Sequence, residues 1–573
     1  MQQPEKVPEA LREDVLTFIA LMDGGQLDEA IAHGEAMAER HMGSVNLYKM
    51  LGSANIKAGR RARAVEWFQR ALQIDPDNID TLYNLAVTCQ ELGGKTAAIE
   101  FFGRILKLKP DSSYIRALKM LLQAHICDWT ALAEDEAHLA TMGIEGKIVS
   151  PFSLLSFEDR PDRHRIRSER YVAHQFSQAP LPEPPRPASP PARLKIGYFT
   201  AEVRHHPVAL LIARVLELHD RARFEITVYS YGPVVEDEMR TRIKSGVDRF
   251  LDVAAGTDQQ IAELARRDGI DIAIDLTGHT TYARTGIFAF RAAPVQISYL
   301  GYPGTSGAPF IDYIVADRNL IPEDQLAAYT EAPIYLPHVY QAQDDRAAIS
   351  SPAPSRAALD LPEEGFVFCA INNGYKIRPE LFDIWMRLLA QVEGSILWLL
   401  DSNPWIKDNL RREAAARGVD PARLVFADWK PHADYLAQLG QADLFLDSFI
   451  YNAGATASHA LWAGLPVLTR IGTGYPARMA SSLLHAIGLS ELITTTDADY
   501  ESLALILANN HARLAAIRAK LARNRDTTPL FDSALFTRHL EDGYVRAHRR
   551  WLAGDPPARI DVPDLSAGAD ARA

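Results

Sequence analysis

The chain has 573 residues, a formal net charge of −12, 47% hydrophobic residues and 23% charged residues. At roughly 150 residues per domain, this length predicts about three or four globular domains. The acidic balance argues against a nucleic-acid-binding protein, because such proteins usually present a basic face.

The amino-terminal residues are charged and lack the apolar core of a signal peptide. No apolar run approaches the roughly 18 residues that a membrane-spanning helix needs. The three cysteines are far apart and have neither disulfide nor metal-ligand spacing. We therefore expect a cytoplasmic protein in a reducing compartment, without a membrane partner.

Residues 48–110 repeat themselves with a period of 34 residues. The first copy carries Tyr48, Leu51, Gly52, Ala64, Phe68, Ala71 and Pro76. The second copy carries Leu82, Leu85, Ala86, Ala98, Phe102, Ile105 and Pro110. Small residues let paired helices approach, the phenylalanine fills the space to the next pair, and proline ends the second helix. The pattern is typical of tetratricopeptide repeats.

A weaker copy with Ala30 at the small-residue position precedes these two, and helical sequence continues to about residue 135. We therefore predict tetratricopeptide-like repeats over residues 1–135, with an ordinary helical bundle as the alternative. Stacked repeats form a concave groove, which predicts a polypeptide partner. A helical extension and a connector follow over residues 136–192, where seven prolines in 177–192 exclude a packed helix or strand.

Short β-branched or aromatic runs then alternate with amphipathic helical stretches, which predicts parallel sheets covered by helices. The first group, in a domain over residues 193–345, lies at 194–200, 224–232, 270–276, 295–301 and 312–317. The second group, in a domain over residues 364–555, lies at 366–371, 395–400, 424–429, 444–448 and 466–469. Two Rossmann-like domains are the natural interpretation, and residues 556–573 are expected to be a disordered tail.

Parallel sheets bind ligands beyond the carboxyl ends of their strands, so the strand-to-helix junctions are candidate sites. His205 and His206 precede Pro207 after the first strand, where they either face a cleft or lie exposed in a loop. His279 follows Gly278 at a second junction, where the neighbouring threonines can instead simply cap a helix. The glycine-rich run 300–309 indicates a backbone shaped around a ligand or around a tight domain contact.

Two junctions of the second domain suit a phosphate. Lys376, in the run 371–379, stands just before a helix, where it is either a phosphate partner or a solvated surface lysine. The run 447–464 places small residues at a helix start near Ala455 and Thr456, which leaves backbone N–H groups open to a diphosphate. The sequence contains no P-loop and no cluster with metal-site spacing, so we expect no metal and no cofactor.

Together these motifs make residues 194–552 resemble the catalytic region of the O-GlcNAc transferases, glycosyltransferase family 41, in its compact bacterial form. The specific runs are LGYPGTSG at 300–307, YKI at 375–377 followed by Pro379, DSFIYN at 447–452 and ALWAGLPVLT at 460–469. The resemblance implies an all-α repeat array followed by an α/β GT-B fold. It also implies inverting, metal-independent transfer of N-acetylglucosamine from UDP-GlcNAc to Ser or Thr hydroxyls of proteins.

The resemblance further implies roles for individual residues. His206, His279 and Lys376 match the family's catalytic positions. Lys376 and the helix start near Thr456 would meet the charge that grows on the β-phosphate, and His206 would orient the acceptor, while no residue stands out as a general base. The donor-binding positions are Asn373, Lys430, Tyr435, Asn452, Gly454, Ala455, Thr456 and His459.

The sequence departs from the family pattern at three of these places. His459 stands where the family has an aspartate for the ribose, Tyr435 where a histidine is common, and Asn452–Thr456 reads NAGAT in place of N-x-H-T-T. These departures keep two alternatives open: transfer of another hexose to Asn or to a non-protein glycan, and a catalytically weak repeat scaffold.

Overall fold

The computed structural model describes residues 9–566. The chain divides into two compact units, residues 1–126 with 130–135, and residues 127–129 with 136–573. Among residues 9–566, no helix is both long enough and apolar enough to cross a membrane.

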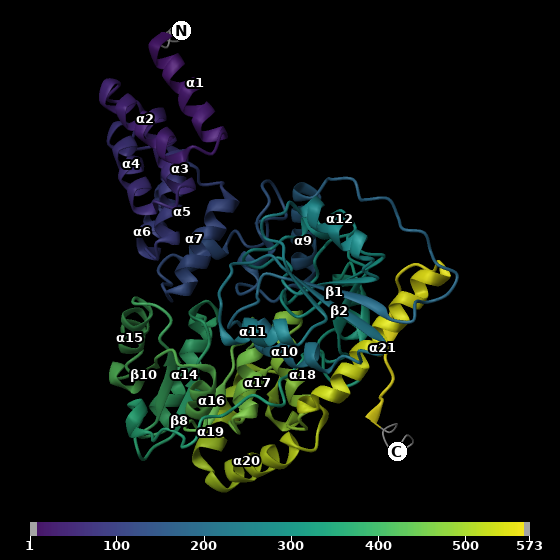
Figure 1. Ribbon diagram of the computed structural model, residues 1–573. Helices are drawn as coiled ribbons and strands as arrows, with labels where there is room; N and C mark the ends of the chain where they lie inside the picture. The colour runs from purple at the N-terminus through teal and green to yellow at the C-terminus, as the bar shows by residue number, and fades with distance from the viewer. Residues whose placement is uncertain (1–8, 567–573) are drawn as a thin grey trace. The chain divides into compact units, whose positions relative to one another are not determined.

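The first unit consists of antiparallel helix pairs (Figure 1). Its helices are α1 (Glu9–Asp23), α2 (Leu27–Arg40), α3 (Val45–Lys57), α4 (Arg61–Ile74), α5 (Ile79–Glu91), α6 (Lys95–Leu108) and α7 (Ser113–His125). The two predicted copies correspond to the pairs α3–α4 and α5–α6. Gly52 is required in the first pair, because a Cβ atom there would lie 2.4 Å from the ring of Phe68.

Eight parallel strands form the first sheet, in the order β14-β7-β6-β5-β4-β1-β2-β3. The strands are β1 (Leu194–Thr200), β2 (Phe224–Ser230), β3 (Arg249–Asp252), β4 (Ile272–Asp275), β5 (Val295–Ser298), β6 (Tyr313–Ala316), β7 (Ala332–Tyr335) and β14 (Ile560–Asp561). The helices between them are α10 (Pro207–Leu218), α11 (Glu238–Ser245), α12 (Asp258–Asp268) and α13 (Gly286–Ala289).

Six parallel strands form the second sheet, in the order β10-β9-β8-β11-β12-β13. The strands are β8 (Val367–Ala370), β9 (Ile396–Leu400), β10 (Leu424–Ala427), β11 (Leu444–Leu446), β12 (Val467–Arg470) and β13 (Ile493–Thr494). Its helices are α14 (Pro379–Gln391), α15 (Ile406–Ala416), α16 (His432–Leu439), α17 (Ala455–Trp462), α18 (Met479–Ala486), α19 (Asp497–Asn509) and α20 (His511–Arg525). Two successive α/β domains with parallel sheets confirm the predicted fold class.

Three strands within these domains are not predicted from the sequence. β3 is a half-exposed edge strand whose sequence begins and ends with charged residues, β7 contains Pro333, and β13 has only two residues. A proline inside a short run argues against a strand, and here it is tolerated close to the sheet edge.

The carboxyl-terminal part of the chain differs from the predicted domain limits. The predicted second domain, residues 364–555, includes helix α21 (Ser533–Ala553), but this helix packs on α10 and β5 of the first domain (Figure 1). Beyond it, β14 pairs with β7, so the predicted disordered tail 556–573 is wrong for its first part. Ile560 and Val562 are buried, and their apolar side chains explain why this stretch is held; residues 567–573 lie outside the described residues.

A supporting segment, residues 127–176, contacts both α/β domains. The thiol of Cys127 donates to the Gly374 carbonyl at 3.5 Å, and the Asp159 carboxylate accepts the backbone N–H groups of Thr473 and Gly474 at 2.6 Å each. Its helix α9 (Pro161–Gln175) contacts the first domain through Tyr171, whose ring centroid lies 5.3 Å from that of His279.

The glycine-rich loop at 300–307 allows close packing against α9. A Cβ atom on Gly307 would lie 2.4 Å from the backbone of Ser168 and Glu169, and the residue has a φ of +65°. A Cβ atom on Gly301 would lie 2.0 Å from the Leu276 carbonyl oxygen. Of the two interpretations of this loop, close packing between segments is therefore the one seen here.

We predict that Gly307→Ala destabilises the protein more than Gly418→Ala. Both glycines have positive φ angles, but a Cβ atom on Gly418 meets nothing within 4 Å. Gly418→Ala should therefore cost only the backbone term of about 1–2 kcal/mol. Gly307→Ala adds a steric cost of about 1–3 kcal/mol. Thermal unfolding midpoints measure both, and equal shifts would contradict the close contact with α9.

Candidate functional site

The predicted site residues lie at the carboxyl ends of strands in both α/β domains. His206 follows β1, His279 follows β4, Lys376 follows β8, and Asn452 follows β11. Ring contacts join the two domains here, since the His205 centroid lies 5.9 Å from those of Trp429 and His432. The loop after β1 and the loops of the second domain therefore form one candidate site with contributions from both domains.

Lys376 is buried at the end of a short 3-10 helix, Gly374–Lys376, and is not a solvated surface lysine. Its ammonium group donates to the Asn452 carbonyl oxygen at 2.8 Å and lies 4.2 Å from the ring centroid of Tyr451. The predicted phosphate lysine and the predicted diphosphate loop are thus in direct contact.

Asp447 is fully buried at the end of β11 and shapes that loop. One carboxylate oxygen accepts the backbone N–H of Ala453 at 2.7 Å and that of Ser448 at 2.8 Å. The other accepts the Thr469 hydroxyl at 2.7 Å. These bonds fold residues 447–453 so that the Asn452 carbonyl faces Lys376.

Burial perturbs the two charged groups of this cluster in opposite directions. Burial lowers the pKa of Lys376, and the nearby Asp447 carboxylate partly offsets that effect. Burial raises the pKa of Asp447, while its hydrogen bonds and Lys376 act against the rise. An anion that reaches Lys376 would favour the protonated ammonium further, because opposite charges stabilise each other in a buried site.

The amino-terminal end of α17 carries the other predicted diphosphate residues. Gly454 precedes the helix, and Ala455 and Thr456 begin it, so their backbone N–H groups face outward along the helix axis. Asn452 is fully buried, and its side-chain oxygen makes no hydrogen bond. Such a helix start binds anions well.

Gln341 is a site residue that the sequence analysis missed. Its side-chain oxygen lies 3.3 Å from where a Cβ atom on Gly454 would be, and its side-chain nitrogen is buried without a hydrogen-bond partner. A buried amide donor without an acceptor is costly, so its position beside the α17 start suits an anionic ligand. Gln341 follows β7 as His206 follows β1, but β7 contains Pro333 and is not predicted from the sequence, so this strand end gives no signal.

Three aromatic side chains of the second domain cluster beside α17. The ring centroid of His459 lies 4.7 Å from that of His432 and 5.8 Å from that of Tyr435. Burial and the neighbouring histidines lower the pKa of His459 to about 3 and that of His432 to about 4. Both imidazoles are therefore neutral near pH 7. The position where the family has a ribose-binding carboxylate thus carries an uncharged ring.

His206 caps α10 with its own side chain. Its Nδ1 atom accepts the Val208 backbone N–H at 3.3 Å and lies 3.6 Å from the Glu202 carboxylate. Burial lowers the pKa of His206 to about 4, so the ring is neutral near pH 7. With the lone pair on Nδ1, the remaining ring nitrogen Nε2 carries the proton and can donate to a ligand.

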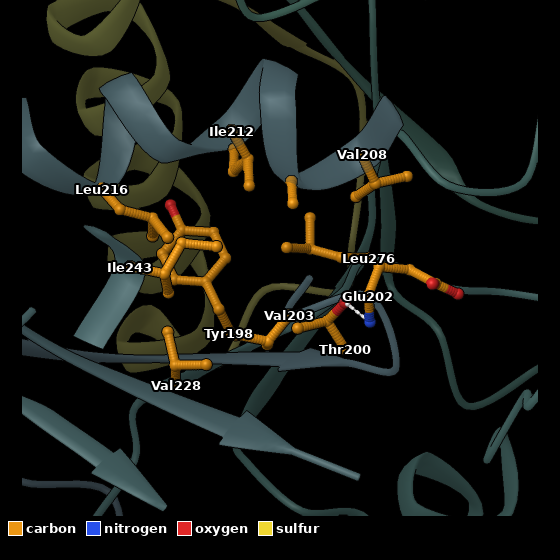
Figure 2. Close-up of a pocket in the computed structure, with 11 residues that line it drawn as sticks. Tyr198, Thr200, Glu202, Val203, Val208, Ile212, Leu216, Val228, Ile243 and Leu276 are labelled. Carbon is orange, nitrogen blue, oxygen red and sulfur yellow. Dashed lines mark hydrogen bonds between the residues drawn. The ribbon is translucent and has the colours of Figure 1, made fainter. Parts of the chain in front are cut away.

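Glu202 is a second missed residue, and Figure 2 shows it at the edge of a small cavity beneath α10. Its carboxylate points away from the apolar lining, forms an ion pair with Arg204 at 2.8 Å, and has its pKa raised by burial. The cavity has a volume of about 10 Å³. It can hold at most about one water molecule, so it is no site for a sugar nucleotide.

The structure does not bring His279 into the same environment. The residue is buried between the rings of Tyr171 and Tyr302, and its Nε2 atom lies 2.6 Å from the Ser306 carbonyl oxygen. These contacts connect the loop after β4 to the 300–307 loop, so they suit a structural role. Asn373 and Lys430 are exposed at the ends of their loops.

Two family models match this chain. The model of glycosyl transferase family 41 matches residues 173–352 and 349–540, and a tetratricopeptide repeat model matches residues 55–122. The solved structure of a mutant O-GlcNAc transferase from Thermobaculum terrenum has a TM-score of 0.69 and 27% identity to this chain. The alignment covers 97% of this chain and all of that one.

Two relatives extend the comparison. A protein of Arabidopsis thaliana named "Probable UDP-N-acetylglucosamine--peptide N-acetylglucosaminyltransferase SEC" is 34% identical over 430 residues, which are 72% of this chain and 44% of that protein. The UDP-N-acetylglucosamine--peptide N-acetylglucosaminyltransferase of Caenorhabditis elegans is 27% identical over 476 residues, with coverages of 64% and 41%. The chain thus spans less than half the length of these relatives. Since the family model matches more than half of its residues, the chain belongs to glycosyl transferase family 41.

Proposed function

We propose that this protein transfers N-acetylglucosamine from UDP-GlcNAc to Ser or Thr hydroxyls of proteins, with inversion and without a metal ion. The observation that carries the proposal is the buried contact between Lys376 and the Asn452 carbonyl beside the start of α17. This arrangement offers a cation and backbone N–H groups to one diphosphate. The names of the relatives support the choice of donor and acceptor.

In the proposed reaction the acceptor hydroxyl attacks the anomeric carbon while the bond to the β-phosphate breaks and UDP departs. The leaving diphosphate gains negative charge in the transition state. Lys376 and the N–H groups at Ala455 and Thr456 stabilise that charge, because they are fixed before the reaction begins. The unpaired amide nitrogen of Gln341 supplies a further donor on the same side.

On the acceptor side, His206 orients the hydroxyl through its Nε2–H group. The neutral ring with its lone pair on Nδ1 suits this donor role better than that of a base. Glu202 lies 3.6 Å from Nδ1 and places a carboxylate of raised pKa beside the histidine. Of the three residues proposed as catalytic, His279 has the least structural support, because its contacts are those of a packed side chain.

The main alternative differs in donor and acceptor: it is the transfer of another hexose to Asn or to a non-protein glycan. The neutral His459–His432–Tyr435 cluster replaces a carboxylate at the nucleotide end, and Gly454 and Ala455 are smaller than the residues common in the family. A panel of UDP-sugars tests this alternative directly. Faster hydrolysis or transfer of UDP-glucose than of UDP-GlcNAc would favour it, and no turnover of any donor would favour a scaffold.

We predict that Lys376→Ala and Lys376→Met abolish most turnover while leaving the fold intact. Removing a donor aimed at transition-state charge costs about 100- to 1,000-fold in rate. The loss of ground-state binding is smaller, about 1.5–3 kcal/mol for a charge-assisted hydrogen bond. Methionine keeps most of the side-chain volume, which separates loss of charge from cavity formation. UDP release and calorimetric UDP affinity measure the two effects.

Lys520→Ala serves as the matched control, since this partly buried lysine pairs with Glu491 at the surface. It should change neither rate nor affinity by more than about 0.5 kcal/mol. Near-normal turnover in either Lys376 variant, at an unchanged melting temperature, would remove Lys376 from the mechanism.

We predict that UDP binds equally well in EDTA and in Mg²⁺ or Mn²⁺. The proposed diphosphate ligands are Lys376, backbone N–H groups and an amide, so no metal ion is needed to balance the charge. Calorimetry with the full chain measures the affinity under both conditions. Binding that disappears in EDTA and returns with Mg²⁺ or Mn²⁺ would contradict the metal-independent mechanism.

We predict that a chain beginning at Cys127 loses activity on folded protein acceptors but keeps UDP binding and activity on short peptides. The reason is that the repeats are proposed to hold polypeptide, whereas the truncation retains Cys127 and Trp129, which pack on Gly374 and Phe382. A thermal melt checks that the truncated chain is folded. Equal losses on proteins, on peptides and in UDP affinity would refute a substrate-selecting role for the repeats.

A further inference from the structure

A cluster of metal-binding side chains lies outside the cleft loops. His338, His539 and Asp564 each offer one ligand atom, and these three atoms lie within 4.8 Å of one another. His338 follows β7, His539 belongs to α21, and Asp564 follows β14. The three side chains therefore connect the edge of the first sheet, the last long helix and the carboxyl-terminal segment. Because the three residues lie far apart in the sequence, they do not form a short motif with metal-ligand spacing.

His338 presents a buried ring nitrogen to the cluster. Its Nε2 atom lies 3.1 Å from the nearer carboxylate oxygen of Asp564. The two side chains thus face each other directly, and a metal ion bound here would be shared by both of them.

His539 presents a lone pair in the same direction. The backbone N–H of Leu565 donates to its Nε2 atom at 2.9 Å, so that nitrogen carries no proton. An imidazole binds a metal ion through such a lone pair.

Asp564 completes the set with a carboxylate oxygen. Its Oδ1 atom accepts the backbone N–H of Ser566 at 2.9 Å. Its Oδ1 atom lies 3.1 Å from Nε2 of His338 and 3.7 Å from Nε2 of His539. Ligands of a tetrahedral zinc ion with bonds of about 2.0 Å are about 3.3 Å apart. The two distances to Asp564 lie on either side of this value, and all three ligand atoms lie within 4.8 Å of one another.

We propose that His338, His539 and Asp564 bind one divalent transition-metal ion of the zinc class, which fastens the carboxyl-terminal segment to β7 and α21. Two imidazoles and a carboxylate suit zinc, with water in the fourth position. Binding requires the Leu565 N–H to turn away from His539, so that the metal ion takes the place of this hydrogen bond. None of the three residues belongs to the proposed transfer site, so this ion is separate from catalysis.

The test uses the full chain, purified without a histidine tag and freed of metal with a chelator. Zn²⁺ is titrated in competition with a coloured chelator, and the melting temperature is recorded with and without Zn²⁺. We expect one equivalent of tightly bound zinc and a higher melting temperature. Asp564→Asn and His338→Gln should each weaken binding by more than 10-fold, since even outer-shell partners contribute about 10- to 100-fold.

Asp555→Asn and His511→Gln are matched controls, because both residues are exposed and lie outside the cluster. They should bind zinc as the wild type does. Asp564→Asn changes an exposed residue and keeps its size, so misfolding is not expected to obscure its result. No saturable zinc binding by the wild type, or unchanged binding by Asp564→Asn and His338→Gln, would overturn the proposal. UDP affinity, measured in parallel, should be the same with and without zinc.

Discussion

Lys376 places an ammonium group in the protein interior, and many of the surrounding contacts stabilise it there. A buried charge needs partners, and Lys376 finds the Asn452 carbonyl, the Tyr451 ring and the nearby carboxylate of Asp447. Asp447 in turn accepts hydrogen bonds from Ser448, Ala453 and Thr469. The loop after β8 and the loop after β11 therefore hold each other in position before any ligand arrives.

The supporting segment 127–176 stabilises the same region from outside the sheets. Cys127 adopts a φ of 52°, which is unfavourable for a residue with a side chain, and its thiol contacts the turn that contains Lys376. Phe152 packs on Tyr375 of that turn, and Tyr171 packs on His279 of the first domain. A change in this segment can thus reach the turn that carries Lys376 and, separately, the packed loops around His279.

The fold was readable from the sequence wherever periodicity was strong. The 34-residue repeat and the ten predicted strands correspond to observed elements, because buried strands and paired helices leave regular apolar patterns. β7 and β14 were not readable, since one contains a proline and the other has only two residues. Lys376 and Asn452 were found from their places at strand ends. Glu202 and Gln341 were not, because their importance depends on burial and on unsatisfied hydrogen bonds, which only three-dimensional contacts reveal.

The return of α21 and β14 to the first sheet has a consequence for biosynthesis. The first domain is translated by residue 345, yet β7 lacks one of its two neighbouring strands, β14, and α10 lacks α21 until residues 533–562 have been made. Meanwhile an exposed strand edge and an apolar helix face stay open to wrong partners. The first domain can therefore be completed only after the second domain has been made.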